Sequence, residues 1–125
     1  MSMRIAPQFL VADLPAALAY YCDKLGFEQK IAYEDFYASV IREGAEIHLK
    51  CAPQSPGERQ HRLDNGHLDA MIEVDKVAAL HAELDARGAH IHQSLQQQPW
   101  GNQDFQVLDP DGHILCFSQE VDAPA

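Results

Sequence analysis

Residues 98–117 of this 125-residue chain read QPWGNQDFQVLDPDGHILCF and contain its clearest structural signal. The DPDG run at 109–112 predicts a turn, because proline presets φ and glycine accepts the positive φ that other residues resist. Apolar and polar residues alternate on both sides of this turn. The residues expected on the buried face are Phe105, Val107, Leu115 and Phe117. The stretch therefore predicts a β-hairpin with one buried face and one mixed face.

Trp100 is the only tryptophan in the chain, and it precedes this hairpin on a loop between Pro99 and Gly101. A large ring on a loop at the mouth of a sheet is a candidate platform for a ligand. The alternative is that the ring caps the edge of the core.

The composition is that of one packed globular domain, which we expect to span 1–125. Hydrophobic residues make up 46% and charged residues 22% of the chain. No run approaches the ~18 apolar residues of a membrane span. No signal-peptide pattern precedes Ile5, so a soluble cytoplasmic protein is expected. The three cysteines, Cys22, Cys51 and Cys116, form no CxxC motif and suggest reduced thiols.

The chain is acidic, with nine Lys and Arg against nineteen Asp and Glu and a formal net charge of −10. This balance argues against nucleic acid or an anionic membrane surface as the partner. It is compatible with a cationic ligand, although acidity also serves solubility.

Taken in order, the periodicity predicts a strand, a helix and three strands, twice over. In the first half, the expected elements are a strand at Met3–Ala12, a helix capped by Asp13 and ended by Gly26, and strands at 27–33, 36–41 and 45–51. The polar stretch 52–66 reads as a linker or mobile loop. In the second half, they are a strand at 67–74, a helix capped by Asp75 and ended by Gly88, a strand that begins at 90–92, and the hairpin.

The two halves are an internal repeat. Asp13 and Gly26 recur 62 residues later as Asp75 and Gly88, and Gly44 recurs 68 residues later as Gly112. We therefore predict an α+β fold of two βαβββ modules, at about 1–52 and about 67–120, with a linker at about 53–66. Their curled mixed sheets would face each other across a ligand cleft.

This pattern resembles the vicinal oxygen chelate superfamily, which includes glyoxalase I, extradiol dioxygenases, fosfomycin-resistance enzymes and bleomycin-resistance proteins. The segments that carry the resemblance are Val11-Ala12-Asp13-Leu14, Tyr20-Tyr21, Leu25-Gly26-Phe27 and Asp109-Pro110-Asp111-Gly112. They span nearly the whole chain. They are specific for the fold and less so for the function.

Within the superfamily, the chain looks most like the bleomycin-resistance proteins. The shared features are Leu25-Gly26-Phe27 running without gaps to Glu34-Asp35-Phe36, the Gln98-Pro99-Trp100-Gly101 run, and the acidic charge. The resemblance implies a homodimer, without enzymatic activity or cofactor, that sequesters a cationic glycopeptide antibiotic in clefts at the subunit interface. Trp100 and Phe36 would stack on its planar rings, and Glu34, Asp35 and Asp104 would be acidic contacts. The cleft would also include His48, Asp69 and Gly101.

The enzymes of the superfamily hold a divalent metal with four cleft-facing ligands, two in each repeat. The corresponding positions here are Ala6, His48, Asp69 and Cys116. Ala6 cannot bind a metal, and Cys116 stands where the enzymes usually carry Glu, so we expect no metal. Gln8 shares the face of Ala6.

Two alternatives remain open. A remodelled three-ligand site could use His48, Cys116 and either Asp69 or His67. The protein would then be a metal-dependent glyoxalase-type lyase, dioxygenase or thiol transferase. Cys116 could also act as a nucleophile beside His48, or be an inert, semi-buried thiol.

Overall fold

The computed structural model describes residues 1–121, so the last four residues of the predicted domain lie outside the described part. The first module contains β1 (Gln8–Val11), α1 (Leu14–Ala19) with a π-helical continuation (Tyr20–Lys24), β2 (Glu28–Tyr33), β3 (Tyr37–Arg42) and β4 (Ala45–Cys51). The second contains β5 (Ala70–Glu73), α3 (Val77–Ala86), β6 (Ile91–Gln97), β7 (Asn102–Leu108) and β8 (Ile114–Glu120). Between them lies α2 (Pro56–Asp64).

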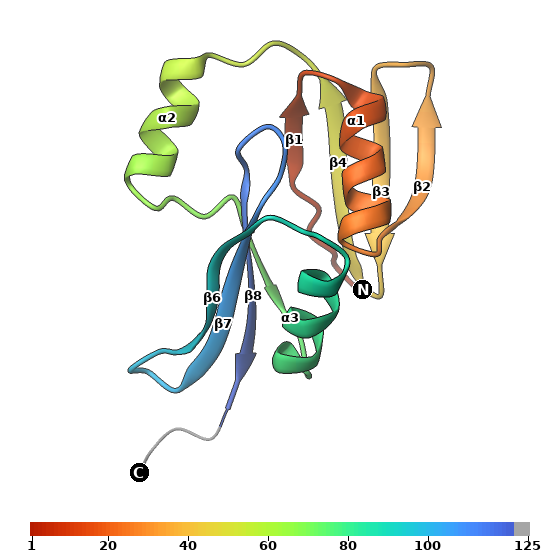
Figure 1. Ribbon diagram of the computed structural model, residues 1–125. Coiled ribbons are helices and arrows are strands. Elements are labelled where there is room, and N and C mark those ends of the chain that lie inside the picture. The colour runs from red at the N-terminus through yellow and green to blue at the C-terminus, as the bar shows by residue number, and fades with distance from the viewer. Residues whose placement is uncertain (122–125) are drawn as a thin grey trace.

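The two sheets have the same topology, which confirms the repeat. Their strand orders are β1-β4-β3-β2 and β5-β8-β7-β6, and in each sheet only the first of these pairings is parallel. Figure 1 shows α1 lying on the first sheet and α3 beside the second sheet. The predicted α+β fold of two βαβββ modules is therefore confirmed, and neither sheet closes into a barrel.

The first helix forms as its sequence predicts. The Asp13 side chain accepts a hydrogen bond of 3.0 Å from the Ala16 N–H and caps the helix. Leu14, Ala17 and Tyr21 are buried on its apolar stripe. The helical segment ends before Gly26, whose φ of +73° is costly for other residues.

The hairpin of 98–117 also forms as predicted. Phe105 lies opposite Phe117, and Val107 lies opposite Leu115. All four side chains are buried in one apolar core that both modules share. Ile114 and Cys116 on the opposite face are buried as well, so β8 is covered on both faces.

The structure differs from the prediction at the start of β1 and at the cap of α3. The first strand begins at Gln8 instead of Met3, because Pro7 has no N–H to contribute to a sheet. The cap of α3 is Lys76 instead of Asp75, and the free Val77 N–H is bound by the Gln119 side chain at 2.9 Å. Tertiary contact has replaced the local cap at this helix.

The segment predicted as a linker or mobile loop contains α2. The Ser55 side chain accepts from the Glu58 N–H at 3.4 Å, and Pro56 occupies the first turn. No residue of the helix is fully buried, so it lacks the apolar stripe by which helices are recognised in a sequence. No helix of residues 1–121 is long and apolar enough to cross a membrane.

Candidate ligand-binding site

The β2–β3 turn presents an aromatic pair to solvent. Phe36 is 40% exposed and meets Tyr33 edge to face, with ring centroids 5.5 Å apart. Glu34 and Asp35 are exposed on the same turn, where Glu34 adopts a φ of +52°. An apolar surface with two carboxylates beside it is suited to a flat cation.

The β6–β7 turn presents Trp100, whose side chain is 68% exposed. The turn is closed by hydrogen bonds from the Gln98 N–H to Asn102 O and from the Gly101 N–H to Gln98 O. Gly101 has a φ of +106°, which explains glycine at this position. Since Trp100 is exposed, it does not cap the core edge in this chain.

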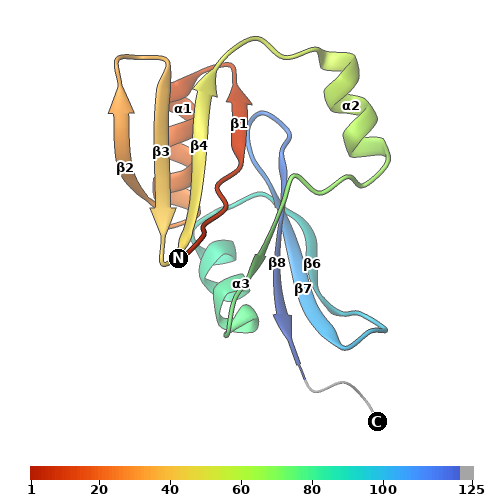
Figure 2. The ribbon, with the colours of Figure 1, turned by 180° about the vertical axis from the view of Figure 1, so that it is seen from behind.

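These two turns lie at opposite ends of the molecule in both views (Figures 1 and 2). The single chain therefore does not bring Trp100 and Phe36 together. Asp104, the third predicted acidic contact, is buried in β7 and accepts from Gln98 Nε2 at 3.0 Å.

His48 lies in a polar row that crosses the first sheet. Its Nε2 is 2.8 Å from Glu46 Oε2, and its Nδ1 is 2.7 Å from the Tyr37 hydroxyl. Gln8 Nε2 donates to the same hydroxyl at 3.2 Å, and Lys30 Nζ lies 2.7 Å from Glu46 Oε1. Sequence reasoning identified His48 but missed two of its partners. The pairing of β3 with β4 brings Tyr37 beside His48, and Glu46 lies two residues before His48 on the same face of β4.

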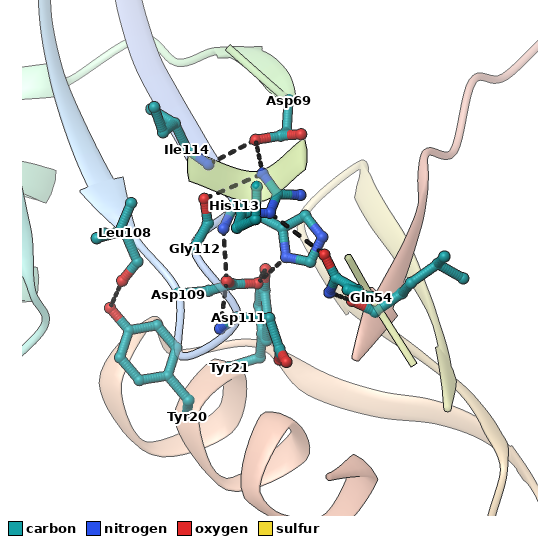
Figure 3. A network of polar contacts seen from close by, with 12 residues as sticks. Tyr20, Tyr21, Gln54, Asp69, Leu108, Asp109, Asp111, Gly112, His113 and Ile114 are labelled. Atoms are coloured by element: carbon teal, nitrogen blue, oxygen red, sulfur yellow. Dashed lines mark hydrogen bonds and ion pairs between the residues drawn. The ribbon is translucent and has the colours of Figure 1, made fainter. Parts of the chain in front are cut away.

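Asp69 is a structural anchor in this chain. Its carboxylate pairs with Arg59 and Arg62 of α2 and accepts from the Ile114 N–H at 2.8 Å. Its side chain is only 3% exposed. Figure 3 shows it against the start of β8, next to the 109–113 turn. Asp69 thereby holds α2 onto the second module.

The strand register bears on two of the four positions at which a metal ligand would stand. In the strand register, Gln8 lies opposite His48, and Met71 lies opposite Cys116. Ala6 and Asp69, the positions predicted for these ligands, lie two residues before Gln8 and Met71. An amide, an imidazole, a thioether and a thiol are a poor donor set for a hard divalent ion. Among residues 1–121, no three His, Cys, Asp or Glu side chains gather as a metal site would require.

Cys116 is 1% exposed, and burial raises the pKa of its thiol to about 11, with the charge of Asp104 adding to the shift. Most of the thiol is therefore protonated near neutral pH, which disfavours a nucleophilic role.

A groove of about 1040 Å³ lies between the two modules. Its apolar floor includes Leu25, Phe27 and Phe117. The charged residues that line it are Arg42, Glu43, Glu46, Asp69, Glu73, Asp75, Lys76 and Glu83. Asp69 is buried and paired with Arg59 and Arg62, so five carboxylates against two cations remain to give this groove an acidic rim, which the sequence did not reveal.

Comparison with known proteins agrees with this architecture. The family model of the Glyoxalase/Bleomycin resistance protein/Dioxygenase superfamily matches residues 5–117. A bleomycin resistance protein of Geobacillus stearothermophilus is 31% identical over 127 aligned positions, which cover 92% of this chain and 95% of that protein. A bleomycin resistance protein of Staphylococcus aureus matches to the same extent.

A solved structure gives the same result at the level of the fold. The bleomycin-binding protein from bleomycin-producing Streptomyces verticillus, complexed with copper(II)-bleomycin, superposes with a TM-score of 0.71 and 25% identity, covering 94% of this chain and 95% of that one. The repeat, the strand order and these matches together show that the chain belongs to the glyoxalase/bleomycin resistance protein/dioxygenase superfamily.

Proposed function

We propose that this protein binds a cationic, aromatic small molecule of the bleomycin type and sequesters it without transforming it. The observation that carries the proposal is the 31% identity, over nearly the full length of both chains, to bleomycin resistance proteins. The bleomycin complex of the Streptomyces verticillus protein, which shares the fold, supports the same ligand class.

The surface chemistry supports this ligand. Trp100 and Phe36 expose rings for stacking, and Glu34 and Asp35 place carboxylates beside Phe36. Stacking and charge pairing would each contribute about 1 kcal/mol when partly desolvated. The net charge of −10 favours the approach of a cation.

The protein would act as a homodimer in the cytoplasm, without a metal cofactor. One chain keeps the turns that carry Phe36 and Trp100 at opposite ends, so a second copy is the simplest way to form one site from both. Strands β1, β2, β5 and β6 are sheet edges that a partner could cover. Three free thiols, those of Cys22, Cys51 and Cys116, suit a reducing compartment.

The test uses the single tryptophan. Metal-free bleomycin is titrated into the protein while Trp100 fluorescence is followed, and calorimetry is run on wild type, Trp100→Ala and Trp100→Phe. We expect saturable quenching at micromolar ligand, weaker binding in the alanine variant, and near-complete retention in the phenylalanine variant, which keeps an aromatic ring.

Two further measurements complete the design. Light scattering after gel filtration should give the mass of two chains. Elemental analysis should find no stoichiometric metal. The absence of quenching up to millimolar bleomycin would exclude bleomycin as the ligand. A monomer that binds bleomycin at full affinity would exclude a site formed by two chains.

A further inference from the structure

The open face of the first sheet, opposite α1, carries a hydrogen-bonded triad. We define this face by the outward residues of its four strands, which are Gln8, Leu10, Ile31, Tyr33, Tyr37, Ile41, Glu46, His48 and Lys50. At its centre, the Tyr37 hydroxyl, the His48 ring and the Glu46 carboxylate form a continuous chain, with distances of 2.7 and 2.8 Å. Tyr37 and His48 are both partly exposed.

The partners of the triad decide where its protons lie. The Glu46 carboxylate lies 2.7 Å from the Lys30 ammonium and 2.8 Å from His48 Nε2, so it accepts from both groups. His48 Nε2 therefore carries a proton and donates to Glu46, which leaves the lone pair of neutral His48 on Nδ1. The Tyr37 hydroxyl then donates to Nδ1 and accepts from Gln8.

This is the arrangement that activates hydroxyl nucleophiles: a hydroxyl within hydrogen-bond reach of a base, and a base held by a third group. We infer that Tyr37 is a reactive nucleophile toward acyl donors of the activated-ester class, with His48 as its general base and Glu46 as the group that positions His48. This inference goes beyond the proposed binding function and does not depend on it.

The step is balanced as follows. The Tyr37 oxygen attacks the acyl carbon, and its proton passes to His48 Nδ1. A bond forms between the Tyr37 oxygen and the acyl carbon, and the bond between the acyl carbon and the leaving alkoxide or phenoxide breaks. The leaving group either takes the proton from His48 or departs as the anion. In the second case His48 releases its proton to water. The product is an aryl ester on Tyr37.

The surroundings favour a small apolar acyl group. Leu10, Ile31 and Tyr33 are 37%, 45% and 62% exposed on the same face. Lys50, an exposed cation, lies directly opposite Tyr37 in the register.

The probe is p-nitrophenyl acetate, and the reading is the acetylation rate of each tyrosine by peptide mass spectrometry. Tyr33, on the same face and more exposed, is the internal reference. We expect Tyr37 to acetylate at least about tenfold faster than Tyr33, since general-base assistance commonly gives a hundredfold or more. Hydroxylamine should remove the label, as it does for aryl esters and not for acetyl-lysine.

Variants then assign the roles. Tyr37→Phe should remove the label at this position. His48→Gln should bring the rate at Tyr37 to that of Tyr33 or below, and Glu46→Gln should lower it partway; circular dichroism checks the fold of each. Equal rates at Tyr37 and Tyr33 in the wild type, which need no variant, would overturn the inference. So would a burst of p-nitrophenolate without label on Tyr37, or an unchanged rate in His48→Gln.

Discussion

The Tyr21 hydroxyl donates a hydrogen bond of 2.8 Å to the Asp109 carboxylate, 88 residues further along the chain. Tyr21 comes from the first module, and Asp109 opens the turn of the second (Figure 3). The same carboxylate also accepts from the His113 ring at 2.7 Å and from the backbone N–H groups of Asp111 and His113. The DPDG turn thus joins the two modules through a buried carboxylate, and Phe9 of β1 stacks on His113 with ring centroids 4.4 Å apart.

Removing the Tyr21 hydroxyl should destabilise the fold. Tyr21→Phe leaves part of a buried carboxylate without its donor, and we expect a loss of about 1–3 kcal/mol in the free energy of unfolding. Burial and the charge of Asp109 raise the pKa of Tyr21 well above its ordinary value, so the hydroxyl remains a donor at neutral pH. Urea unfolding measures the change. Tyr33→Phe, at an exposed position, is the matched control, and an equal loss in both variants would contradict the assignment.

The ion pair of Arg42 with Glu83 should contribute to the free energy of unfolding, and this contribution should disappear in acid. Two hydrogen bonds of 2.9 and 2.7 Å join Arg42 of β3 to Glu83 of α3. Bonding to Arg42 first, and then to Arg87, lowers the pKa of Glu83 from 4.5 to about 2. A carboxylate whose pKa is lowered in the folded state stabilises the fold at pH values above its ordinary pKa. This stabilisation is lost as the pH falls toward the pKa of the folded state.

The comparison of wild type with Glu83→Gln tests this contribution. Their difference in unfolding free energy should be constant above about pH 5, at no more than about 1 kcal/mol because the pair is partly exposed, and should shrink between 4.5 and about 2. It should also shrink in high salt. A difference that persists unchanged at pH 2 would show that packing, and not charge, is responsible.

Two turn glycines should differ sharply in their tolerance of alanine. Gly112 has a φ of +83°, and a Cβ there would lie 2.7 Å from the Cδ of Arg59. Gly112→Ala should therefore cost about 1–2 kcal/mol or more. Gly44, at the equivalent place in the repeat, has no atom within 4 Å of such a Cβ, so Gly44→Ala should change stability by less than about 0.5 kcal/mol. Thermal unfolding of the two alanine variants measures the difference. Comparable losses of stability in both variants would refute the steric argument.

Cys116 should be the slowest of the three thiols to react. It is buried, and its pKa is about 11, whereas Cys22 and Cys51 are partly exposed. Thiolate is the reactive form, so at pH 8 iodoacetamide should modify Cys116 last in the native protein, and all three thiols should react in denaturant. Peptide mass spectrometry over time gives the order. Rapid native labelling of Cys116 would revive its role as a nucleophile.

Removing the Ser39 hydroxyl should not harm the fold. Its Oγ is fully buried, and within residues 1–121 it finds no hydrogen-bond partner. A buried polar group without a partner is a cost, so Ser39→Ala should leave the unfolding free energy unchanged or raise it by up to about 1 kcal/mol. A clear loss of stability would reveal a partner for this hydroxyl, such as bound water.

The sequence by itself determined the features that depend on neighbours along the chain. The apolar period of the first helix, the Asp13 cap, the turns at Gly26 and Gly112 and the alternation of 104–118 all follow from local backbone and side-chain chemistry. Because these signals occur twice in the same order, they also gave the repeat, and with it the fold.

Only the tertiary structure decided the features that depend on which strands pair and in what register. Pairing brings Tyr37 beside His48, and it sets Gln8 and Met71 opposite His48 and Cys116, where Ala6 and Asp69 were predicted. The packing of α2 binds this helix to Asp69 through arginines instead of apolar residues. The tertiary structure also keeps the turns of Phe36 and Trp100 apart. A shift of one or two residues leaves local periodicity nearly unchanged but exchanges every cross-strand neighbour, so these contacts are settled by the packing of the whole chain.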